Sequence, residues 1–134
     1  MAISSATLKR LFLGVGAAAV AAGLFQLTRF LRSENERKLA SLPLKDRGLA
    51  LLDDVGCSDC HQTGSPLRAP ILPGLFGKAV TLQDGTTVVA DEDYLRRSII
   101  DPKAQVVQGY QATMPSYQGQ LDPDDIEAII AAMK

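Results

Sequence analysis

Histidine and cysteine are scarce in this 134-residue chain, which contains one histidine and two cysteines. The cysteines, Cys57 and Cys60, are too few for a disulfide framework, and no further cysteine remains to carry a lipid anchor. A structural zinc site takes four protein ligands, and these cysteines together with His61 supply only three. The scarcity of these residues therefore excludes disulfide-rich and lipid-anchored classes and weighs against zinc.

The chain also lacks a strong overall charge, because its formal net charge is −1. The charge is unevenly distributed: residues 1–38 contain six basic and two acidic side chains, whereas residues 39–134 contain eight basic and thirteen acidic ones, a net charge of −5. An acidic domain is poorly suited to the phosphate backbone of nucleic acids. We therefore expect no nucleic-acid partner.

The cysteines and the histidine stand together in one five-residue string, Cys57-Ser58-Asp59-Cys60-His61. Cys-x-x-Cys-His is the attachment pattern of a c-type haem. Two thiols three positions apart can each form a thioether bond to one vinyl group of the same porphyrin, and the histidine that follows can bind the iron. The motif predicts one covalently bound haem c, with Cys57 and Cys60 as attachment points and His61 as the proximal ligand.

Three alternatives to haem are weaker. A thioredoxin-like thiol pair opens a helix after a strand, whereas the residues before Cys57 have a helical pattern. A zinc site lacks its remaining ligands. A structural disulfide between Cys57 and Cys60 would close a very short loop.

A sixth ligand to the iron would come from methionine, because the chain has no second histidine. Met133 lies on the apolar face predicted for the last helix, where methionine usually fills the core. Met114 lies in a loop before Pro115, which stiffens the chain. Since cytochromes c commonly pair methionine with histidine, we predict that His61 and Met114 both bind iron; the alternative is that Met114 is a buried loop hydrophobe.

Ligation by His61 and Met114 fills both axial positions of the iron, so no open position is left for oxygen or peroxide. This arrangement favours an electron carrier over an enzyme. The alternative is a haem enzyme with an open distal site, in which Met114 does not bind iron.

A run of apolar and small residues extends from Leu11 to Thr28, roughly 18 residues, which is near the lower limit for a helix that spans a bilayer. We predict a single-pass membrane anchor at residues 1–31, contacting lipid through residues 11–28, and a linker at residues 32–43. A cleaved signal peptide, with residues 19–21 as a small-x-small site, is the alternative.

More basic side chains follow the predicted span than precede it, which by itself would place the following domain in the cytoplasm. Known c-type cytochromes receive their haem outside the cytoplasmic membrane, and we give this more weight. We therefore expect the anchor in the cytoplasmic membrane of a bacterium, with the haem domain on the periplasmic side. Gly14, Ala18 and Ala22 share one helical face, which is typical of close helix packing inside a larger membrane complex; a merely hydrophobic span is the alternative.

Residues 44–134 are predicted to form a mostly α domain with one small β-hairpin. Gly56 ends the first helix, Asp91 caps the second, and Asp122 and Pro123 begin the last. The hairpin is expected around a two-residue Asp84-Gly85 turn, with its strands in the segment 79–90. The helices are expected at 45–55, at 91–100 and from 122 onward.

Six stretches of this domain match one known family: residues 56–61, 70–77, 80–86, 90–96, 114–117 and 119–121. On these stretches the domain resembles a class I c-type cytochrome, in particular the cytochrome c domain fused to subunit II of bacterial haem-copper cytochrome c oxidases. The resemblance covers residues 44–134. It implies a helical fold in which the first and last helices cross and haem sits in a crevice.

The resemblance also implies residue roles. The backbone carbonyl of Pro70 would accept the Nδ1 proton of His61 and so orient the ring, and Tyr110 and Tyr117 would lie near the haem. Two positions depart from the family: Ala69 stands where glycine is common, and Ala132 stands where an aromatic residue often packs.

Together these observations predict a membrane-anchored monohaem cytochrome that transfers single electrons. It would act as a subunit of a respiratory or photosynthetic complex, either a quinol-oxidising complex or a terminal oxidase, between redox donor and acceptor proteins. The alternative is a free-standing tethered or soluble periplasmic shuttle.

Overall fold

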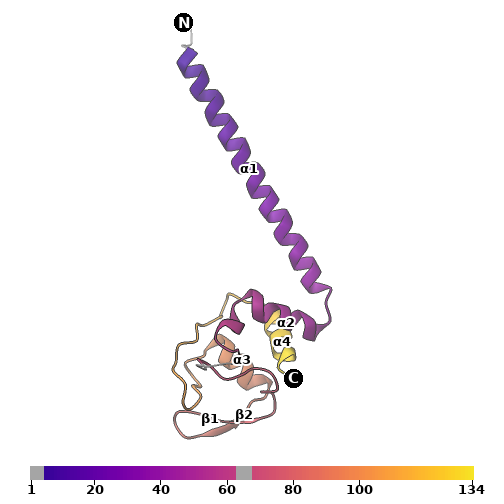
Figure 1. Cartoon of the computed structure of the whole chain (residues 1–134), viewed down its shortest axis with the longest axis vertical. Coiled ribbons are helices and arrows are strands. Elements are labelled where there is room, and N and C mark those ends of the chain that lie inside the picture. The colour runs from indigo at the N-terminus through magenta and orange to yellow at the C-terminus, as the bar shows by residue number, and fades with distance from the viewer. Residues whose placement is uncertain (1–4, 63–67) are drawn as a thin grey trace. The chain divides into compact units, whose positions relative to one another are not determined.

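The computed structural model describes residues 5–62 and 68–134, and for residues 5–18 it describes the backbone alone (Figure 1). The chain divides into two compact units, Met1–Ser41 and Leu42–Lys134. About half of the chain is helical, and the described residues contain four α-helices and one two-stranded antiparallel hairpin. The prediction of helices with one small β-hairpin is thus confirmed as far as the number and type of elements are concerned.

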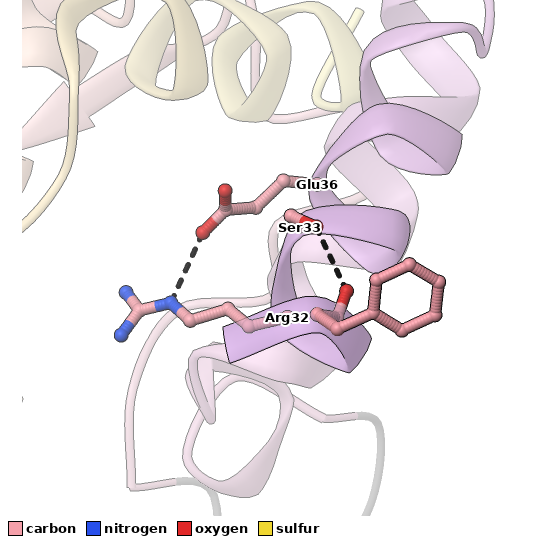
Figure 2. A network of polar contacts seen from close by, with 4 residues as sticks. Arg32, Ser33 and Glu36 are labelled. Atoms are coloured by element: carbon pink, nitrogen blue, oxygen red, sulfur yellow. Dashed lines mark hydrogen bonds and ion pairs between the residues drawn. The ribbon is translucent and has the colours of Figure 1, made fainter. Parts of the chain in front are cut away.

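The first unit contains one helix, α1, which runs without interruption from Ser5 to Ala40. Most of the predicted linker is therefore helical. Polar contacts stabilise this end of the helix: Nε of Arg32 donates to Oε1 of Glu36 at 3.0 Å, and Oγ of Ser33 donates to the carbonyl of Phe30 at 2.8 Å (Figure 2). Pairing between residues four apart is a normal source of helix stability on an exposed face.

Large apolar side chains of α1 are exposed from residue 20 to residue 31, where they include Val20, Leu24, Phe25, Leu27, Phe30 and Leu31. Among the described residues, however, no helix is both long enough and apolar enough to cross a membrane. The predicted span, residues 11–28, lies partly in the segment for which side chains are not described. The membrane anchor stays a prediction.

The second unit is built from α2 (Leu44–Asp54), a short 3₁₀ helix η1 (Cys57–Asp59), β1 (Ala79–Thr81), β2 (Thr87–Val89), α3 (Glu92–Ile100) and α4 (Pro123–Ala132). The predicted ends of these helices agree with the structure. Gly56 adopts a left-handed conformation (φ 76°) after α2, and Pro123 occupies the first turn of α4. Asp122 stands at the N-cap of α4, but its side chain makes no capping hydrogen bond.

The core of this unit is the crossing of α2 and α4, with α3 packed against α4. Gly48 permits the close approach, because a Cβ atom at this position would lie only 1.8 Å from the carbonyl oxygen of Ala128. Ile129 and Ile130 of α4 are almost completely buried beside it. An ion pair between Arg47 and Asp125 joins the two helices at the edge of the core.

The hairpin differs from the prediction in its register. Val80 pairs with Val88, and Thr81 pairs with Thr87. The amide of Leu82 donates to the carbonyl of Thr86 at 2.8 Å, so the loop contains three residues rather than the predicted two. Gly85 closes it with φ 85°, the left-handed position of a three-residue hairpin loop. Because side chains alternate along a strand, this one-residue shift leaves Val89 exposed and turns Val88 towards the core.

The start of α3 provides a first testable prediction. Oδ1 of Asp91 accepts a hydrogen bond from the amide of Tyr94 at 2.8 Å, so Asp91 caps the helix as expected. Asp91→Ala should lower the free energy of unfolding by about 1 kcal/mol, because the amide loses its partner. Asp91→Asn, which retains a capping oxygen, is the control. Equal stability of the Ala variant and the wild type in denaturant titration would show that the cap contributes nothing.

Candidate functional site

A largely apolar cavity of about 270 Å³ lies within the second unit. One side is formed by Cys57, Cys60 and His61, and another by the long loop between α3 and α4, which includes Met114. We call residues 101–122 the methionine loop. The cavity also reaches the buried side chains of Leu95, Ile99 and Ile129, which makes its interior apolar.

The turn after α2 places the cysteine motif at this cavity. Gly56 reverses the chain, and the carbonyl of Cys57 then accepts hydrogen bonds from the amides of Cys60 (3.3 Å) and His61 (3.0 Å). This single turn carries the three side chains of the motif to the cavity. Cys57 is half-buried and Cys60 is exposed, and both thiols are free.

The environment of Cys57 differs from that of a redox-active thiol. Burial raises the pKa of the Cys57 thiol above its usual value, although the nearby Tyr117 hydroxyl acts in the opposite direction. Reactive thiols need a lowered pKa, which the N-terminus of a helix or a cationic neighbour often supplies. Cys57 instead follows the C-terminal end of α2 and begins only the three-residue 3₁₀ turn η1. This arrangement disfavours the thioredoxin-like alternative.

His61 is oriented by one strong contact. Its Nδ1 lies 2.6 Å from the backbone carbonyl oxygen of Pro70, nine residues further along the chain. A carbonyl can only accept, so the bond requires the proton on Nδ1 and leaves the lone pair of the neutral ring on Nε2. The hydrogen bond that the family resemblance implied for Pro70 is therefore present. It fixes the tautomer that a metal-binding histidine needs.

Two methionines line the cavity. Met114 is half-buried in the methionine loop, whereas Met133 is buried in the core cluster and follows α4 directly. The structure thus brings Met114 to the same cavity as His61, and it places Met133 in the core, as predicted. Met1 lies outside the described residues. Tyr110 and Tyr117 also line the cavity, and the Tyr117 hydroxyl donates to the carbonyl of Val55 at 3.2 Å.

Sequence reasoning did not identify two polar side chains of the cavity. Oγ of Ser98 and Oε1 of Gln105 are buried without a hydrogen-bond partner among the described residues, and both side chains line the cavity. A buried polar atom without a partner is unfavourable by about 1–3 kcal/mol. Neither residue belongs to a recognisable motif; only the packing of α3 and the loop after it shows where they lie.

The described residues contain no group of three or more His, Cys, Asp or Glu side chains that could hold a metal ion. Neither the protein-family models nor the curated proteins searched give a match to this chain. The functional interpretation therefore depends on the motif, on the family resemblance of the sequence and on the geometry of this cavity.

Proposed function

We propose that this protein is a monohaem c-type cytochrome that transfers single electrons. The observation that carries this proposal is the convergence of Cys57, Cys60, His61 and Met114 on one largely apolar cavity. The donor set suits haem c: two free thiols for the thioether bonds, an imidazole with its proton held on Nδ1, and a thioether sulfur. The crossing of α2 and α4 beside the cavity agrees with the class I cytochrome c fold.

When bound, the haem would supply a reversible one-electron couple at its iron. Cys57 and Cys60 would hold it covalently, and His61 and Met114 would bind its iron. Pro70 would keep the imidazole in the tautomer that leaves Nε2 available. The apolar side chains around the cavity would exclude water and favour the less charged, reduced centre.

The location of the protein and its partners are further parts of the proposal. The exposed apolar side chains at residues 20–31 of α1, followed by Arg32, Arg37 and Lys38, suit an anchor in the cytoplasmic membrane with basic residues at its interface. The haem domain would then face the periplasm as part of a quinol-oxidising or terminal oxidase complex. Its net acidic charge suits redox partners with a basic docking surface.

Carbon monoxide binding distinguishes a carrier from an enzyme with an open iron. The reduced wild-type protein should bind carbon monoxide poorly, because Met114 would bind the iron and compete with carbon monoxide. Met114→Leu should bind it readily, and its reduction potential should fall. Optical titration of the reduced full-length protein with carbon monoxide measures the first effect, and potentiometry measures the second.

Met133→Leu is the matched control, because it makes the same change at the other cavity methionine. A Met-to-Leu exchange in a core conserves volume and should leave carbon monoxide binding unchanged. If Met133→Leu rather than Met114→Leu increased carbon monoxide binding, the assignment of Met114 as the iron ligand would be wrong. Ready binding of carbon monoxide by the reduced wild type would favour the alternative, a haem enzyme in which Met114 does not bind iron.

A further inference from the structure

The β1–β2 hairpin is hydrogen-bonded to the methionine loop. The amide of Gln83 donates to the carbonyl of Val106 at 2.8 Å, and the amide of Gln108 donates to the carbonyl of Thr81 at 2.9 Å. Leu82 and Val107 form an antiparallel bridge between these two bonds. The first part of the loop thus adds a short, strand-like segment to the hairpin.

A side chain extends this contact further along the loop. Nε2 of Gln83 donates to the backbone carbonyl of Tyr110 at 2.7 Å. Tyr110 lies four residues before Met114, and both residues line the cavity. No residue of the hairpin itself lines the cavity, and Figure 1 shows β1 and β2 away from α2 and α4. Val80 and Leu82 of the hairpin segment pack in the same core cluster as the cavity residues Leu95 and Ile99, and the loop adds a hydrogen-bonded route from the hairpin to the cavity.

The loop is fixed again just after Met114. The amide of Tyr117 donates to the carbonyl of Ile99 at 3.1 Å, and Oγ of Ser116 donates to the carbonyl of Ile100. Between Tyr110 and Ser116, the hydrogen bonds of the described residues include only one within the segment, from the amide of Thr113 to the carbonyl of Gln111. The position of Met114 therefore depends on two attachment points, one at the hairpin and one at the end of α3.

We propose that the hairpin is a brace for the methionine loop and that Gln83 is a positioning residue, which holds Met114 at the cavity through Tyr110. The claim that Gln83 positions an iron ligand rests on the proposed function. The claim that the hairpin holds the methionine loop in place does not. The loop would open locally when the brace is lost, so that Met114 leaves the cavity more often while α2 and α4 stay packed.

Gln83→Met tests this brace, because it preserves the shape of the side chain and removes its donor. One hydrogen bond of ordinary net strength corresponds to about a two- to tenfold change in an opening equilibrium. Amide hydrogen exchange at Tyr110 and Thr113, whose amides donate to the carbonyls of Val107 and Gln111, should accelerate by this factor. In the oxidised haem protein, binding of added imidazole should accelerate similarly, and the near-infrared methionine–iron band should disappear at a lower pH.

Gln108→Met is the matched control. The side chain of Gln108 makes no hydrogen bond to another described residue, and its backbone amide bond to Thr81 is unaffected by the substitution. Exchange and imidazole binding in this variant should stay within about twofold of the wild type. A second variant, Gly85→Val, strains the hairpin loop at φ 85° without touching the methionine loop, and it should reproduce the effect of Gln83→Met.

The outcomes separate the brace from the proposed function. Unchanged exchange at the hydrogen-bonded amides of Tyr110 and Thr113 in both Gln83→Met and Gly85→Val would overturn the brace, whether or not the protein carries haem. Faster exchange with an unchanged methionine band and imidazole rate would overturn the positioning of Met114 as a ligand. A wild-type protein without haem would overturn the proposed function, while the exchange measurement would still decide the brace.

Discussion

The double variant Cys57→Ala/Cys60→Ala should lose all covalently bound haem. Both attachment points would be removed, and the chain has no other cysteine that could replace them. Each single variant should retain at most one thioether bond. Mass spectrometry of the denatured protein and haem staining after denaturing electrophoresis both measure the attachment, independently of any activity.

Ser58→Ala provides the control for this experiment, because Ser58 lies between the cysteines. Its hydroxyl donates to Oδ1 of Asp53 at 2.5 Å, and Ser58 is not among the residues that line the cavity. We expect full haem attachment in this variant. Haem that remained covalently bound in the double cysteine variant would show that the attachment site lies elsewhere.

Gly48→Ala should cause the largest loss of stability among the substitutions considered. The new Cβ would meet backbone atoms, at 1.8 Å from the carbonyl oxygen and 2.5 Å from the carbonyl carbon of Ala128. Neither atom can move without separating α2 from α4. We expect the free energy of unfolding to fall by more than about 3 kcal/mol, as in severely overpacked cores. Denaturant titration of the full-length protein measures this loss.

Helix propensity acts in the opposite direction at this position, because alanine is better than glycine inside a helix by about 1 kcal/mol. A stabilised Gly48→Ala protein would therefore show that the two helices do not approach as closely as the structure places them. Leu49→Ala is the control: this neighbouring side chain is 48% exposed, and its loss should cost much less.

Local sequence patterns predicted those parts of the fold that depend on local chemistry. The cap at Asp91, the left-handed glycine at Gly56 and the proline at the start of α4 each act within a few residues, and each stands where it was expected. The hairpin register was wrong because the Asp84-Gly85 pair is compatible with both a two- and a three-residue loop. The hydrogen bond from Leu82 to Thr86, which decides between them, has no signature in the sequence.

In the candidate site, too, the residues of a local motif were predictable from the sequence, whereas contacts that depend on tertiary packing were not. The motif identified Cys57, Cys60 and His61 directly, whereas the contact between His61 and Pro70 was expected from the family resemblance alone. The unpaired oxygen atoms of Ser98 and Gln105 depend on how α3 and the methionine loop pack around the cavity. The same is true of the contact between Gln83 and Tyr110, which joins residues 27 positions apart.

The optical spectrum of the purified full-length protein, oxidised and reduced, tests the central claim most directly. Our account predicts a c-type α-band in the reduced form and a near-infrared methionine–iron band in the oxidised form, which together report covalent haem and ligation by Met114. A haem spectrum without the near-infrared band would contradict the assignment of Met114. A protein without haem absorption would contradict the account as a whole. Cys57 and Cys60 would then have to be explained as a redox-active thiol pair or as metal ligands.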